Sequence, residues 1–194
     1  DQKIVVAGRC VVTSTLTTHF CAIRLLPNGF FDTSFFGTGY KRLFAAPGAT
    51  EIPRSVLVQP DGRIVIAGQC GPEVAPTHTC VMRLLEDGSN DDSFGTSGRV
   101  MIDFPGSGIQ GGRVVRLLPD GKLLVGGQCK GTTVGATGGC VIRLNINGSL
   151  DTSFGSGGRV YVVNTLFPDT VSDLVVDPAG RIYVASWGNT ALPP

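Results

Sequence analysis

A short apolar segment that recurs along the chain constrains the fold more than any other feature of the sequence. Its copies are IVVAGRC (4–10), IVIAGQC (64–70), LLVGGQC (123–129) and the diverged IYVASWG (182–188). The equivalent residues Gly8, Gly68 and Gly127 are 60 and 59 positions apart. Self-similarity at a fixed spacing is the signature of a repeat architecture, so we predict repeats with a period of about 60 residues.

Each repeat contains four short apolar runs with turn-forming residues between them. In the third copy the runs are GRVVRLLP, KLLVGGQC, CVIRLNI and RVYVV, and the turns include Asp120-Gly121 and Asn147-Gly148. Such pairs supply the positive φ of tight turns, and runs rich in Val, Ile and Leu favour strands. No segment has the apolar periodicity of a helix. We predict an all-β fold of four-stranded antiparallel blades, a β-propeller or propeller segment, rather than a β-solenoid with its shorter repeats.

The repeats also share a longer pattern, which runs from PDG through two apolar strands to an Asn-Gly or Asp-Gly pair and a D-x-S-F-G motif. Its clearest copy is SLDTSFG at residues 149–155. Over nearly the whole chain this pattern resembles the delta-60 repeat family. The resemblance implies an exported bacterial β-propeller, and it supplies no activity and no catalytic residues. The chain departs from the family pattern in its paired cysteines and its shortened fourth repeat.

The phase of the repeats predicts the organisation of residues 1–194 as a single repeat domain. The expected units are 1–49, 50–108, 109–168 and 169–194. The first unit lacks its first strand, and the last contains only its first two strands. We therefore expect that the chain is a piece of a longer array, or that several chains complete one another.

Six cysteines flank the loops between the second and third strands of three repeats. The pairs are Cys10 with Cys21, Cys70 with Cys80, and Cys129 with Cys140. The two members of a pair lie at the same rim of one hairpin, within reach of a disulfide, and their spacing without C-x-x-C is poor for zinc. Each bridge would stabilise the fold by roughly 2–3 kcal/mol. Structural disulfides indicate an oxidising compartment: periplasm, cell surface or exterior.

Three residue types recur in every complete repeat and are candidates for structural roles. They are the aspartates Asp32, Asp91 and Asp151, the phenylalanines Phe35, Phe94 and Phe154, and the arginines Arg24, Arg83 and Arg143. We expect the aspartates to accept hydrogen bonds in turns, the phenylalanines to fill the gap between blades, and the arginines to pair with carboxylates or carbonyls. Calcium is the alternative role for the aspartates, although the motif lacks the D-x-D-x-D spacing typical of calcium loops.

Two histidines and the single tryptophan are possible interface residues. His19 and His78 each precede the second cysteine of a pair by two positions, so we expect them at one rim and facing solvent. Trp187 ends the second strand of the last repeat, as a core residue or an interface anchor. We expect no metal and no cofactor, with calcium as the only alternative.

Charge and composition exclude several function classes. The net charge is +1, which gives no electrostatic reason to expect a nucleic-acid partner. No apolar run is long enough for a transmembrane segment. The recognisable residues are shared by every repeat, whereas a catalytic site needs unlike residues that converge once. From the inner strands we expect only Gly, Val and Ile to face a central channel, so we expect no hydrolase or lyase site there and predict that the chain is not an enzyme.

We therefore predict a non-enzymatic extracytoplasmic scaffold or protein-interaction module, with the role of an accessory subunit in a larger envelope or surface assembly as one form of it. Its expected partners are other protein subunits or further repeats of the same polypeptide. The alternative is a glycan- or ligand-binding module that uses the loops between the cysteine pairs. Those loops are rich in Thr and small residues and offer no aromatic platform on which sugars stack, which counts against this alternative.

Overall fold

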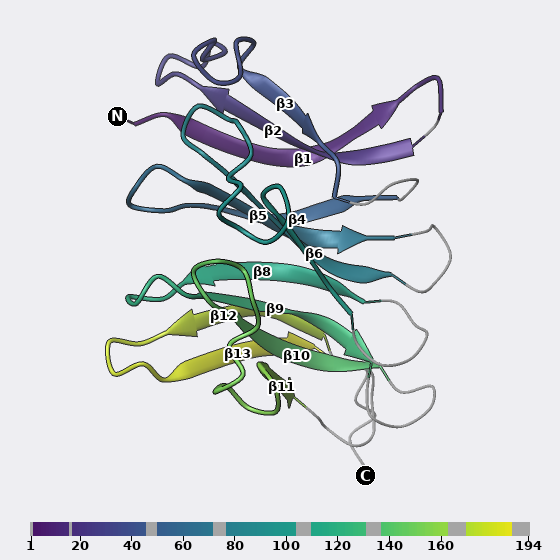
Figure 1. Cartoon of the computed structure of the whole chain (residues 1–194), viewed down its shortest axis with the longest axis vertical. Coiled ribbons are helices and arrows are strands. Elements are labelled where there is room, and N and C mark those ends of the chain that lie inside the picture. The colour runs from purple at the N-terminus through teal and green to yellow at the C-terminus, as the bar shows by residue number, and fades with distance from the viewer. Residues whose placement is uncertain are drawn as a thin grey trace.

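Four antiparallel sheets, stacked in the order of the sequence, make up the computed structural model (Figure 1). It describes residues 2–15, 17–45, 50–71, 77–103, 110–130, 137–162 and 170–187, which contain strands and no helix. The strands are β1 (Ile4–Val12), β2 (Thr17–Leu25) and β3 (Tyr40–Leu43); β4 (Ile52–Val58), β5 (Ile64–Cys70), β6 (His78–Leu84) and β7 (Arg99–Ile102); β8 (Gly111–Leu117), β9 (Leu123–Lys130), β10 (Thr137–Leu144) and β11 (Arg159–Val162); β12 (Thr170–Val176) and β13 (Ile182–Trp187). The prediction of an all-β fold with four-stranded antiparallel sheets is confirmed.

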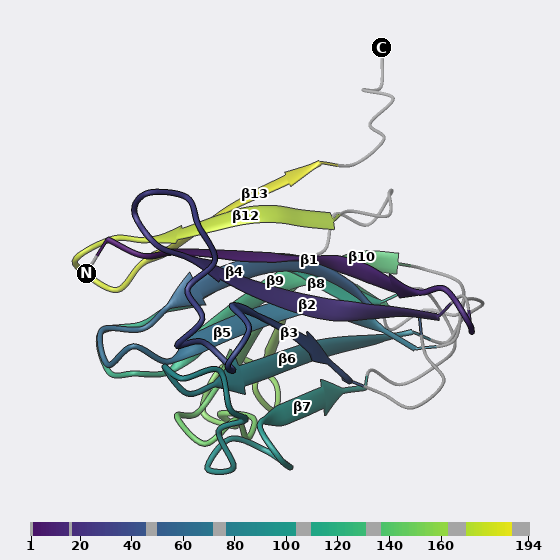
Figure 2. The same cartoon turned by 90° about the horizontal axis from the view of Figure 1, so that it is seen from above.

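Within each sheet the strands follow one another in sequence order, which places the first strand of each sheet at an edge. The first strand β8 contacts the first strands β4 and β12 on its two sides, and β1 contacts β4. They lie together on one side of the molecule, with β7 on the opposite side (Figure 2). The described strands form an open stack of sheets and do not close into a ring, so the structure corresponds to the segment that we predicted as one possibility.

The apolar core forms three layers, one between each pair of neighbouring sheets. β5 shows why its sequence is continuously apolar. Ile64 and Ile66 pack toward the first sheet, whereas Val65 and Ala67 pack toward the third. Because successive side chains of a strand point to opposite faces, a strand between two sheets needs apolar residues at every position.

Three disulfides join neighbouring strands in the first three sheets. They link Cys10 to Cys21, Cys70 to Cys80 and Cys129 to Cys140, with Cα–Cα distances of 5.8, 5.9 and 5.7 Å. These distances lie within the usual range for a disulfide. The predicted pairing is confirmed.

A search for helices that could cross a membrane finds none in the described part of the chain.

Candidate functional site

The D-x-S-F turn of each of the first three sheets encloses a carboxylate between polar and charged groups. In the second sheet, Asp91 Oδ1 accepts hydrogen bonds from the backbone N–H and the hydroxyl of Ser93 at 3.0 and 2.6 Å. Its Oδ2 accepts from Arg83 Nε at 2.7 Å, and the Arg83 guanidinium lies over the Phe94 ring. Asp32 and Asp151 make the same contacts in the other two sheets.

Each of these aspartates contacts a second positive charge, from the residue that precedes the second strand of its repeat. The pairs are Lys3 with Asp32 at 3.2 Å, Arg63 with Asp91 at 2.9 Å, and Lys122 with Asp151 at 2.8 Å. A calcium ion at these turns would have to displace both cations. We therefore find no support in this geometry for the calcium alternative.

The hydrogen bonds and charges around the aspartates lower their pKa values. For Asp32 the hydroxyl of Ser34 is the main cause of the lowered pKa, and for Asp151 the main cause is the ammonium group of Lys122. At Asp91 burial acts to raise the pKa, but the hydrogen bonds from Ser93 and the charge of Arg83 outweigh it, and the pKa is lowered. These carboxylates are therefore ionised at neutral pH, which suits a structural ion pair rather than a general acid.

The D-x-S-F turn of one sheet packs on the Asp-Gly or Asn-Gly turn of the next, and we call this packing the inter-sheet contact. Between the first and second sheets, Phe35 lies against Gly88, Phe36 N donates to Asp87 O at 2.7 Å, and Arg24 Nη1 donates to Glu86 O. A Cβ at Gly88 would lie 2.8 Å from the Phe35 ring, so only glycine allows this approach.

The same inter-sheet contact forms between the second and third sheets. There Phe94 lies against Gly148, Gly95 N donates to Asn147 O at 2.8 Å, and Arg83 Nη1 donates to Ile146 O at 2.6 Å. The structure thus places Phe35 and Arg24, and likewise Phe94 and Arg83, between sheets. The two copies differ in sequence but share these three contacts, so neighbouring repeats associate in the same way in both.

Within the described residues, no turn of the fourth sheet packs on the equivalent surface of the third sheet. Its Arg143 side chain is 23% exposed, against 7% for Arg24 and 3% for Arg83. Phe154 is only partly buried, whereas Phe35 and Phe94 are fully buried. Among the described residues Arg143 contacts only its own turn, through Asp151, Ser153 and Phe154.

At the opposite end of the stack, the turn of the first sheet is the uncovered half of the same contact. Gly29 is exposed, and a Cβ there would meet no atom within 4 Å. Its equivalents Gly88 and Gly148 are buried beneath phenylalanine rings. The stack therefore ends in complementary surfaces.

The two histidines lie in different surroundings. His19 is 5% exposed and stacks on Phe44, with its Nδ1 3.6 Å from Oε2 of the buried Glu51. Our expectation that it faces solvent does not fit this position, because Glu51 of the second sheet brings the ring into the gap between two sheets. His78 is partly buried and pairs with Asp103.

The remaining sequence-based candidates fall largely beyond the described residues. The backbone of Trp187 pairs with Thr170 in the last sheet. Two of the loops enclosed by cysteine pairs lie largely outside the described residues. These are residues 72–76, between Cys70 and Cys80, and residues 131–136, between Cys129 and Cys140. The proposed ligand-binding role of these loops therefore stays a prediction.

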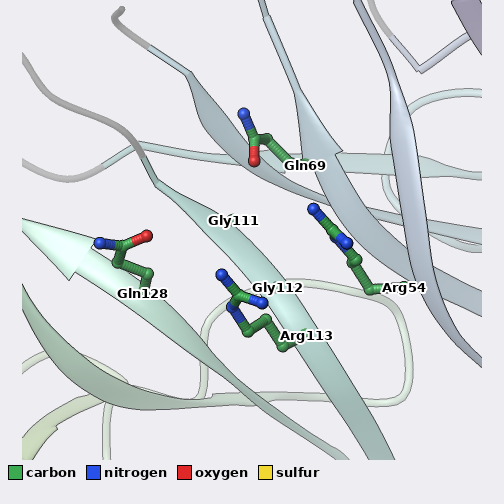
Figure 3. A pocket seen from close by; sticks show the side chains of 6 residues that line it. All are labelled: Arg54, Gln69, Gly111, Gly112, Arg113 and Gln128. Carbon is green, nitrogen blue, oxygen red and sulfur yellow. The ribbon is translucent and has the colours of Figure 1, made fainter. Parts of the chain in front are cut away.

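A polar pocket on the first strands was missed by the sequence analysis. Its lining residues are Arg54, Gln69, Gly111, Gly112, Arg113 and Gln128 (Figure 3). The expectation that only Gly, Val and Ile face this side is wrong, because a β-bulge occurs in both β4 and β8. The extra residue of each bulge is an arginine, and bulges re-aim side chains in this way. An arginine at the same position of two first strands was the available signal.

A family model of a propeller-type repeat matches two parts of the chain. Residues 59–94 and 118–154 match the model described as "Domain of unknown function (DUF5122) beta-propeller". This supports a resemblance to a propeller-type repeat family. A search of the curated proteins finds no match.

One similar solved structure is that of MPT-4, a mannose phosphorylase from Leishmania mexicana, in complex with a phosphate ion. It shares 13% sequence identity with this chain, at a TM-score of 0.47. The alignment covers 95% of this chain and 60% of the phosphorylase chain. This finding contradicts the prediction that the chain is not an enzyme, because an enzyme has a similar arrangement of strands. At this TM-score the likeness assigns neither activity nor ligand to this chain.

Proposed function

We propose that this chain is part of an extracytoplasmic propeller that acts as a scaffold or protein-interaction module, and that it binds a further repeat of its own kind. That repeat belongs to the same polypeptide or to another subunit of an envelope or surface assembly. The observation that carries the proposal is the inter-sheet contact, which is complete in two copies, whereas no described turn packs on Arg143 and Phe154 of the third sheet. The delta-60 repeats are the specific family that we propose for the chain.

The partner must supply a third strand and the turn that follows it. β13 pairs with β12 on one side only, whereas the second strands β5 and β9 pair on both sides. A strand added to the free edge of β13 would extend the last sheet, as in β-strand addition. Its Asn-Gly or Asp-Gly turn would then reach Phe154, as Gly148 reaches Phe94.

A second copy of this chain fits less well. The turn that it could offer follows β2, and β2 is already paired with β1. β1 is a second strand, like β13, so both would compete for the same edge. We therefore favour a repeat with a free third strand over a second copy.

The three disulfides support an oxidising compartment, for which we propose the periplasm, the cell surface or the exterior. Peptide mapping of the natural protein under non-reducing conditions tests this part of the proposal. Disulfide-linked peptides with the pairing described above are expected, and free thiols in the natural protein would contradict it.

A peptide with the sequence of residues 137–158, with Ser in place of Cys140, tests the interaction. It contains a third strand, the Asn147-Gly148 turn and a D-x-S-F motif. Native mass spectrometry should show one peptide bound per chain, and hydrogen exchange should show new protection along β13. A matched peptide with Ala-Ala in place of Asn147-Gly148 cannot form the tight turn and should bind at least about tenfold more weakly.

Variants of the chain locate the binding surface. Arg143→Gln should weaken binding of the peptide, whereas Arg42→Gln, which removes an exposed charge from β3, should leave it unchanged. Equal binding of the two peptides, or equal effects of the two variants, would overturn the proposal.

A further inference from the structure

The pocket on the first strands carries an inference that is independent of the proposed association between repeats. Arg54 is the extra residue of the bulge in β4, between Pro53 and Ser55. Arg113 is the extra residue of the equivalent bulge in β8, between Gly112 and Val114. The two strands lie side by side, and the backbone N–H of Val115 donates to Ser55 Oγ at 3.2 Å, which fixes one strand against the other.

The charges of these two arginines are not compensated within the described part of the chain. Six other arginines form ion pairs with aspartates: Arg24, Arg63, Arg83, Arg116, Arg143 and Arg181. Arg54 and Arg113 have no ion pair there, although both line one pocket. Burial lowers the pKa of Arg113, and the positive charge of Arg54 lowers it further. Two like charges held together without a counter-charge raise the free energy of the empty site.

The pocket itself is small, with a cavity volume of about 10 Å³, and its other side chains are neutral hydrogen-bond donors. Gln69 from β5 and Gln128 from β9 lie on two sides of it, and both carry side-chain N–H groups (Figure 3). Gly111 and Gly112 of β8 lie between them. A Cβ at Gly111 would lie 2.8 Å from Cβ of Gln69, so glycine is needed for this close approach.

We propose that the mouth of this small pocket binds a small dianionic oxyanion, a phosphate or sulfate group, between the guanidinium groups of the exposed Arg54 and the partly buried Arg113. Two guanidinium groups match a charge of about −2 and bind phosphate-type oxygens in a bidentate manner. The amides of Gln69 and Gln128 complete the set as neutral hydrogen-bond donors. The site is specific to the middle of the stack, because the equivalent bulge residue in β12 is Ser172.

Titration with inorganic sulfate and inorganic phosphate tests the site directly. Either anion should raise the melting temperature of the protein above that in sodium chloride of the same ionic strength. NMR should show shifts of the side-chain amides of Gln69 and Gln128 and of the Gly111 backbone amide. Sodium acetate separates the alternatives, because a carboxylate site would respond to acetate as strongly as to sulfate and would overturn the assignment to a dianion.

Two variants and a matched control complete the test. Arg54→Gln and Arg113→Gln should each weaken sulfate binding by about tenfold or more, since each loses a charge-assisted hydrogen bond. Arg42→Gln carries the same change of charge on the outer strand β3 and should bind sulfate normally. Equal responses to sulfate and chloride, or equal losses in all three variants, would contradict the proposal, because they would show only a general effect of net charge.

Discussion

Two regions of this molecule contain arginines, and they differ in whether the positive charge is neutralised by a carboxylate. At the D-x-S-F turns, Arg24, Arg83 and Arg143 each contact a carboxylate of their own sheet at 2.7 Å. At the bulges, Arg54 and Arg113 line a pocket in which no carboxylate takes part. The first arrangement recurs in three sheets, whereas the second is confined to two neighbouring strands.

This difference in charge compensation indicates a structural role for the arginines of the turns and a binding role for the arginines of the bulges. A charge that is neutralised within its own turn stabilises that turn and leaves little interaction for a ligand. A pair of charges that repel each other lowers stability unless something else binds to them. The turns therefore hold neighbouring sheets together, and the bulges provide a surface on which a ligand can relieve the repulsion.

The largest expected effect comes from the phenylalanines that fill the inter-sheet contacts. Phe94→Ala should lower the free energy of unfolding by about 3–5 kcal/mol, because a fully buried ring is lost between two sheets. Phe154→Ala should cost about 1–2 kcal/mol, since that ring is only partly covered. Urea unfolding followed by circular dichroism measures both.

Phe30→Ala serves as the control for these two variants, because its side chain is 72% exposed and its loss should change stability little. An equal loss of stability in Phe94→Ala and Phe154→Ala would show that the third D-x-S-F turn is already filled. That result would remove the main support for a further repeat as the partner.

The next effect is expected in acid and involves the aspartates of the turns. Their pKa values in the folded protein are lower than the value of about 3.9 expected for the unfolded chain. The stabilisation from these aspartates is therefore complete above about pH 5 and is lost as the pH falls below 4 toward the folded values. The urea midpoint should fall over this interval.

Asp151→Asn provides the comparison for the acid effect. This variant lacks one of the three carboxylates, so it should be less stable than the wild type at pH 7 and should lose less stability on acidification. Parallel declines in the two proteins would show that the turn aspartates do not cause the acid sensitivity.

The repeated features of the fold could be predicted from the sequence because each appears several times. Three copies of the cysteine spacing select one pairing from many, and all three pairs form disulfides. The apolar character of β5 similarly reflects its position between two sheets. Contacts within one repeat are short in sequence, and repetition makes them recognisable.

The features that were missed depend on contacts between repeats or on local irregularity. His19 and Glu51 are 32 positions apart and meet only because neighbouring sheets stack. Arg54 and Arg113 lie within apolar runs. The alternation of side chains along a regular strand does not show that these two point into one pocket. Only the bulges show that these side chains line a shared pocket.

The smallest effect on stability is expected at the bulges, and it distinguishes the two regions most directly. In buffer free of sulfate and phosphate, Arg113→Gln should change the free energy of unfolding by no more than about 0.5 kcal/mol, because no ion pair is lost. The identical substitution Arg83→Gln removes a buried partner of Asp91 and should cost about 1.5–3 kcal/mol. Urea unfolding of the two variants side by side measures this contrast. If Arg113→Gln were as destabilising as Arg83→Gln, the arginine of the bulge would have a structural role like that of the turns. Neutral or slightly increased stability would instead show that the folded protein keeps Arg113 beside Arg54 at a cost, as expected for a charge that serves a ligand.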